Sequence, residues 1–249
     1  MIKLKNLAKT KFWNLKKIND DVGEVMLYSV IDSDSFWGDE TTPENFSKDL
    51  DSLGDIKTLN IYINSPGGDI FAGYAICSIL NRKTYEKIAY IDGLGASIAS
   101  VIPMCCDKVY MYTNTMMMIH KPWSSKTGNA TTLRTAADRL DKIEDTIIDL
   151  YLKRVNLDKE TISKMLEDET WLSAEECVKH GFADEILGEN KVVACIDPEL
   201  MKGYKNLPES IKNMINAYQS NVLSEPQVSQ AINYDVKNKL RTLELLEHC

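Results

Sequence analysis

The feature that most constrains the fold is an alternation of short β-rich runs and helical stretches, joined by brief turns that often contain glycine. The β-rich runs cover residues 58–63, 87–91, 108–112 and 116–119, and helices are predicted over 71–80 and 97–105. Strands and helices that alternate over short connections favour right-handed βαβ units. We therefore expect an α/β core.

Further elements flank this alternation. A first strand is predicted over Val25–Ile31, and Thr42-Pro43 is typical of a helix start that Gly54 would end. Downstream, a long amphipathic helix is predicted over 133–151 and a short helix capped by Asp158. Residues 173–176 form a capping-box pattern, and the predicted helix ends at His180-Gly181 before a short closing strand over 182–186.

The chain of 249 residues is long enough for one sizeable core and a tail. We expect a lysine-rich N-terminal arm over residues 1–21, one domain over 22–189 and a C-terminal appendage over 190–249. The appendage is polar and contains prolines, with amphipathic segments near 210–218 and 228–246.

Charge and cysteine content exclude several classes. A net charge of −8 argues against general nucleic-acid binding. No apolar run approaches the ~18–20 residues of a membrane span, and the basic start lacks the apolar region of a signal peptide. The cysteines show no CxxC spacing, so we expect no metal site, no cofactor and no disulfide framework, and a reducing, cytoplasmic setting.

Ser97 follows a predicted strand and begins a predicted helix, within Gly95-Ala96-Ser97-Ile98-Ala99. A serine at such a turn can be exposed at the positive end of a helix dipole, as a nucleophile requires. The alternative is that Ser97 only caps a buried helix.

Two further segments could complete a catalytic site. The turn Ser65-Pro66-Gly67-Gly68 could offer an unobstructed backbone N–H to an oxyanion, or it could be a plain strand-to-helix turn. His120 ends a predicted strand and is the best placed of the three histidines to act as a base. An acid that orients this histidine could come from the run 167–169.

The segments 62–68, 93–97, 118–122 and 172–176 together resemble, in order and spacing, the Clp family of serine peptidases. The resemblance spans roughly residues 22–187. It implies a ClpP/crotonase-like α/β fold of repeated ββα units, with a protruding handle helix that mediates ring stacking. The helical appendage expected from composition over residues 190–249 would follow this fold.

The resemblance also assigns roles. It implies Ser97 as nucleophile, His120 as general base, and the backbone N–H groups of Gly68 and Ile98 as the oxyanion hole. The family's acid is an aspartate just before the Leu-Ser-Ala segment. Matching without gaps puts Glu169 at that place, with Asp168 one residue away as the alternative.

The ends of the chain look more like phage-encoded relatives that act in head maturation. We therefore expect an ATP-independent serine endopeptidase, assembled into homo-oligomeric rings, that processes phage scaffold or capsid precursors in the host cytoplasm. It would bind peptide substrates, and neither nucleic acid nor membrane. The alternatives are the proteolytic subunit of an ATP-dependent Clp protease, a catalytically idle assembly protein on this fold, and a crotonase-like acyl-CoA enzyme.

Overall fold

The computed structural model describes residues 12–32, 42–189, 201, 203–213, 215 and 216. Within them an eight-stranded sheet has the order β1-β2-β3-β4-β5-β8, and β6 pairs with both β4 and β7. The strands are β1 Trp13–Lys17, β2 Val22–Tyr28, β3 Thr58–Ser65, β4 Glu86–Ala96, β5 Lys108–Tyr112, β6 Met116–Ile119, β7 Thr170–Ser173 and β8 Glu185–Leu187. Pairing is parallel except at β1–β2 and β6–β7, so the predicted α/β fold is confirmed.

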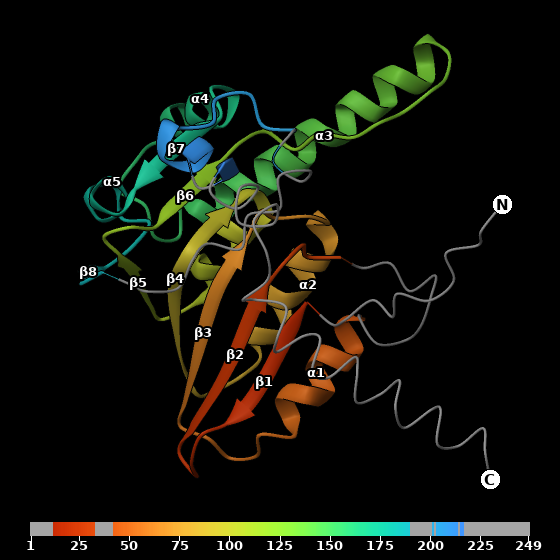
Figure 1. The fold of residues 1–249 in the computed structure, drawn as a ribbon. Coiled ribbons are helices and arrows are strands. Elements are labelled where there is room, and N and C mark those ends of the chain that lie inside the picture. Colours follow the sequence, from red (N-terminus) through yellow and green to blue (C-terminus); the bar gives the residue numbers. More distant parts are fainter. Residues whose placement is uncertain (1–11, 33–41, 190–200, 202, 214, 217–249) are drawn as a thin grey trace, which may run out of the picture.

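The helices are α1 Pro43–Asp51, α2 Ile70–Asn81, α3 Ala130–Tyr151, α4 Lys159–Glu167 and α5 Ala174–His180, with the short 3-10 helices η3 Ser97–Ser100 and η4 Ile102–Cys105. Figure 1 shows α1 and α2 side by side along the sheet. None of the helices in the described part of the chain is both long and apolar enough to cross a membrane.

Alternation along the central strands separates the core from the open face of the sheet. Leu59, Ile61 and Ile63 of β3 are fully buried. Tyr62 points to the other face, where its ring stacks on Tyr90 of β4 at 5.0 Å. This period of two is the pattern of strands that bury one face.

The predicted caps are confirmed. The side chains of Thr42, Asp158 and Ser173 accept backbone N–H bonds at the starts of α1, α4 and α5, and the capping box of α5 is complete. Gly181 ends α5 with φ +84°, a conformation that glycine adopts without strain. These local signals are strong because each one satisfies N–H or C=O groups that the helix leaves unpaired.

The helix predicted over 97–105 is wrong as a single α-helix. The chain forms two 3-10 helices instead, and Pro103 stands at the start of the second. Proline lacks an N–H and disfavours an α conformation before it, which interrupts a continuous helix. β4 is also longer than predicted, since it runs straight through Gly93-Leu94-Gly95.

Two strand boundaries differ from the prediction. β2 lies over Val22–Tyr28, and Ser29, with φ +97°, ends it. The closing strand β8 begins at Glu185, because Phe182 is packed in the core and Asp184 accepts the backbone N–H of Val109.

Parts of the predicted arm and appendage pack on the domain. Strand β1 falls within residues 1–21, and the indole of Trp13 is 4% exposed and donates to Asp49. In the appendage, residues 209–213, 215 and 216 are helical, whereas the predicted segment 228–246 lies outside the described residues. The boundaries at 21 and 189 stay a prediction.

Helix α3 extends away from the rest of the structure (Figure 1). Its buried side chains, Ile147, Ile148 and Tyr151, all lie near its C-terminal end, and Leu133 near its start is 47% exposed. The protruding helix expected from the resemblance is therefore present.

Candidate active site

Strand pairing brings the predicted site residues to one edge of the sheet. The second half of β4 runs parallel to β6, so Ser97 after β4 and His120 after β6 emerge together. β7 runs antiparallel to β6, with Thr170 opposite Ile119, which puts Glu169 beside His120. The carboxyl edge of parallel strands is the usual place for sites in α/β proteins.

Ser97 is held in a strained backbone conformation. Its φ is +54°, which a residue with a side chain adopts at a cost of about 1–3 kcal/mol. The capping position of η3 belongs to Ala96, so the alternative that Ser97 is only a helix cap is wrong. The strained turn directs the Ser97 hydroxyl toward His120.

His120 meets that hydroxyl. Its Nε2 lies 2.8 Å from Ser97 Oγ, a hydrogen-bond distance. Burial of the ring lowers the pKa of His120, and the negative charge of Glu169 partly opposes this shift. A histidine whose pKa lies below its ordinary value is neutral near pH 7, so the His120 imidazole can accept a proton.

Glu169 and Asp168 lie in different surroundings. Glu169 is 9% exposed and acts on His120 through its charge, although no hydrogen bond joins the two side chains in the described part of the chain. The Asp168 carboxylate instead forms an exposed ion pair with Lys164 at 2.9 Å. Of the two candidate acids, only Glu169 faces the Ser–His pair.

The turn before α2 approaches Ser97 closely. A Cβ on Gly67 would lie 2.6 Å from Ser97 Cβ, and one on Gly68 would lie 2.0 Å from the Ile31 carbonyl oxygen. Both glycines have positive φ. No side chain larger than hydrogen fits at either position, and neither the Gly68 nor the Ile98 N–H has an acceptor among the described residues.

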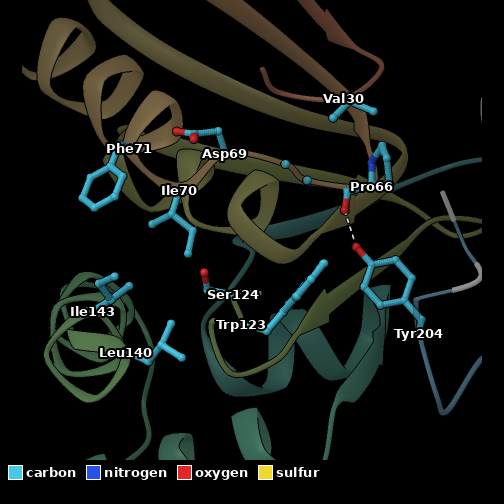
Figure 2. Close-up of a pocket in the computed structure, with 12 residues that line it drawn as sticks. Val30, Pro66, Asp69, Ile70, Phe71, Trp123, Ser124, Leu140, Ile143 and Tyr204 are labelled. Carbon is cyan, nitrogen blue, oxygen red and sulfur yellow. Dashed lines mark hydrogen bonds between the residues drawn. The ribbon is translucent and has the colours of Figure 1, made fainter. Parts of the chain in front are cut away.

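A pocket of about 440 Å³ opens next to this turn (Figure 2). Its lining includes Gly67 and Gly68 and is otherwise mostly apolar, from Ile70, Phe71, Trp123, Leu140, Ile143 and Tyr204. Phe71 and Trp123 are 67% and 73% exposed, so large aromatic surface stands open to solvent at its rim. A pocket of this volume and lining suits an apolar group of a small ligand or peptide.

Sequence reasoning missed one group of residues at the site. Tyr204 lines the pocket and packs edge-on against the His120 ring, with centroids 5.5 Å apart. The backbone N–H groups of Lys205 and Asn206 donate to the Glu169 carboxylate. Nothing in the polar, proline-containing appendage indicates these contacts, because they depend on where the chain returns in space.

The other candidate residues lie apart from the site. His180 belongs to the last turn of α5, and His248 lies outside the described residues. Four cysteines are buried and form no disulfide: Cys77, Cys105, Cys106 and Cys177. No cluster of side chains in the described ranges could hold a metal ion.

In this α/β fold a strained serine hydroxyl lies within hydrogen-bond distance of an imidazole, beside an open pocket. This arrangement is typical of hydrolytic enzymes. Residues 46–190 match the Clp protease family. The chain belongs to this family of peptidases, and the resemblance noted from its motifs is confirmed.

Three relatives, each named as a proteolytic subunit of an ATP-dependent Clp protease, illustrate the match. The protein of Deinococcus radiodurans is 30% identical over 144 residues, which are 57% of this chain and 71% of the relative. That of Chlamydia abortus is 33% identical over 129 residues, 50% and 67% of the two chains. That of Streptococcus pneumoniae is 30% identical over 147 residues, 57% and 75%.

Proposed function

We propose that this chain is a serine peptidase, with Ser97 as nucleophile and His120 as general base. The observation that carries the proposal is the 2.8 Å hydrogen bond between Ser97 Oγ and His120 Nε2 in a member of the Clp protease family. The strained φ of Ser97 supports it, since strain of this kind gathers at functional sites.

The geometry suits acyl transfer in two halves. Ser97 Oγ attacks the carbonyl carbon of the peptide bond while His120 Nε2 takes the hydroxyl proton. The carbon–nitrogen bond then breaks, and Nε2 returns that proton to the departing amine. Water, deprotonated in turn by His120, attacks the acyl carbon. The bond from that carbon to Ser97 Oγ breaks, Nε2 returns its proton to Oγ, and the acid is released.

The oxyanion that forms in each half needs donors fixed in advance. The N–H groups of Gly68 and Ile98 fit this role, because Ile98 follows Ser97 in the chain and Gly68 follows Gly67, which packs against Ser97. Neither N–H has an acceptor within the described residues. Donors of this kind stabilise the transition state more than the substrate.

Glu169 is the better candidate for the third member of the triad. Strand register, burial and the sign of its effect on His120 all favour it over the exposed Asp168. A glutamate in this position would stabilise the imidazolium that forms during each proton transfer.

The substrate would be a peptide with an apolar side chain next to the cleaved bond. The chain of the peptide would lie extended beside Gly68 as an added strand, and the pocket lined by Ile70 and Trp123 would receive the side chain. The apolar character of the pocket favours such residues over charged ones.

We also propose assembly into homo-oligomeric rings, with the projecting half of α3 packing on another copy. The relatives favour the alternative stated above, a proteolytic subunit that works with an ATP-dependent partner. Cleavage of phage capsid precursors stays a prediction that the comparisons do not support. The family match also favours a peptidase over a crotonase-like enzyme.

A fluorophosphonate probe tests the proposal. It should form an adduct at Ser97, mapped by mass spectrometry, and the adduct should be lost in Ser97→Ala and His120→Ala. Ser125→Ala, which alters a nearby exposed serine, is the matched control and should label normally. Absence of labelling in the folded wild-type oligomer would leave the idle assembly protein as the better interpretation.

A second assay addresses the partner. Hydrolysis of short peptides without ATP, together with degradation of a folded protein only when an ATPase is added, is the result expected of a Clp subunit. Efficient cleavage of folded proteins by this chain alone would contradict that part of the proposal.

A further inference from the structure

The part of the chain that follows the family-matched region returns to the catalytic edge of the sheet. We call the described residues between 201 and 216 the C-terminal segment. Met201 and Ile211 are each about 1% exposed and bury against Leu94, Ala96 and Met118. Those three residues belong to the strands that lead to Ser97 and His120, so the segment is docked directly beneath the site.

Tyr204 of this segment connects three pieces of the site. Its ring packs edge-on against His120, with centroids at 5.5 Å, and against Trp171 at 5.8 Å. Its hydroxyl donates to the carbonyl oxygen of Pro66, in the turn that carries Gly67 and Gly68 (Figure 2). Burial raises the pKa of Tyr204 to about 12, so the hydroxyl remains a donor at physiological pH.

The next two residues hold the acid. The N–H of Lys205 lies 2.8 and 3.1 Å from the two carboxylate oxygens of Glu169, and the N–H of Asn206 lies 2.7 Å from one of them. A carboxylate that is 9% exposed has little contact with water, and such donors replace the hydrogen bonds that water would give it. Without the segment, Glu169 would lose these bonds and its fixed position beside His120.

We propose that Tyr204 is a positioning residue for His120 and the Pro66 turn, and that the Lys205 and Asn206 amides hold Glu169, so that the C-terminal segment completes the catalytic centre. The inference rests on the proposed function. The segment leaves the site open: the Ser97–His120 hydrogen bond is formed and the adjoining pocket keeps about 440 Å³. This is the geometry of a support, because a blocking segment would fill the pocket.

Variants at Tyr204 in the full chain test the first half of the proposal. Tyr204→Ala should lower kcat for a short peptide about 100-fold, the cost of a misplacement of about 1 Å, with a smaller change in KM. Tyr204→Phe loses only the bond to Pro66 and should cost about tenfold or less. Asn213→Ala, an exposed position on the same segment, is the control and should keep wild-type kcat.

The pH profile tests whether Tyr204 acts on His120 itself, beyond any effect on the stability of the fold. The titratable groups that face His120 are Glu169 and Tyr204. Tyr204→Ala exposes the imidazole to water, which weakens the burial that lowers the pKa of His120. The acidic limb of kcat/KM should therefore move to higher pH in Tyr204→Ala, and it should stay in place in Tyr204→Phe, which keeps the ring beside His120, and in the control Asn213→Ala.

A proline substitution tests the second half. Lys205→Pro removes the N–H that bonds Glu169, and Lys205→Ala keeps it. We expect kcat of the proline variant to be at least about tenfold below that of the alanine variant. Thermal unfolding of each variant, followed by circular dichroism, checks that it is folded.

Two results would overturn the inference. A rise in kcat in Tyr204→Ala or Lys205→Pro would make the segment inhibitory, and an unchanged kcat and pH profile would make it mere packing. Failure of the proposed function looks different, because the wild-type chain would then not react with the fluorophosphonate at all.

Discussion

Gly73, near the start of α2, packs against Ile98, the residue that follows the proposed nucleophile. A Cβ built on Gly73 would lie 2.2 Å from Ile98 Cγ1 and 3.0 Å from its Cδ1. Helix propensity alone predicts that Gly73→Ala stabilises the protein, by about 1 kcal/mol. The tertiary contact predicts a different outcome, which makes this substitution a sharp test of the site.

The new methyl group cannot be accommodated by a small side-chain movement. Carbon atoms pack at about 3.5–4.0 Å, so the contact would be more than about 1 Å too short. Ile98 is β-branched and 2% exposed, so its χ1 has little freedom and the backbone of η3 or α2 must move. Overpacking of this kind costs about 1–3 kcal/mol, and the gain in helix propensity offsets about 1 kcal/mol of it.

We therefore expect Gly73→Ala to lower the free energy of unfolding by about 0–2 kcal/mol. Activity should suffer far more. If η3 moves, it carries with it the Ile98 N–H, the proposed oxyanion donor, and loss of one such donor costs about 100- to 1000-fold in kcat.

The assay is peptide hydrolysis, measured alongside thermal unfolding. Ile98→Ala removes Cγ1 and Cδ1, so the double variant Gly73→Ala/Ile98→Ala should recover kcat relative to Gly73→Ala. Ser78→Ala, on the exposed face of the same helix, is the control and should change neither property by much. If Gly73→Ala were more stable than the wild type and kept full kcat, the steric reasoning and the role of Ile98 would both be refuted.

Three further predictions follow from the site and its scaffold. Glu169→Gln removes the charge that raises the pKa of His120, so the acidic limb of kcat/KM should shift to lower pH and kcat should fall. Asp168→Asn, which alters an exposed ion pair with Lys164, should change neither quantity. Equal effects of the two substitutions on the pH profile would argue against Glu169 as the acid. Gly68→Ala places a Cβ 2.0 Å from the Ile31 carbonyl oxygen at φ +146°, so it should destabilise the chain by more than about 1 kcal/mol in denaturant unfolding and abolish measurable peptide hydrolysis. Ser173→Ala removes the cap of α5 and should cost about 1 kcal/mol in the same unfolding experiment; no loss would mean that the capping box is dispensable.

Local chemistry explains which elements could be predicted. Thr42, Asp158 and Ser173 mark helix starts because their side chains satisfy N–H groups within three residues, a contact that needs no distant partner. The same kind of local reasoning predicts the interruption near Pro103, since proline lacks the N–H that a continuous helix requires.

The length of β4 shows the limit of local signals. The sequence of β4 contains two glycines that are typical of a turn, yet pairing with β3 and β6 keeps the strand extended through them. Pairing with neighbouring strands outweighs the local preference, and that pairing depends on residues far away in the chain.

By itself, the sequence determined the α/β core, the helix caps and the pair Ser97 and His120, because each depends on short-range patterns or on motifs in a recognisable order. The tertiary structure alone decided which acid faces the imidazole. Register between β6 and β7 turns Glu169 inward and leaves Asp168 with Lys164. It also decided that Tyr204 reaches His120, since a contact between residues so far apart in the chain exists only once the sheet has brought them together.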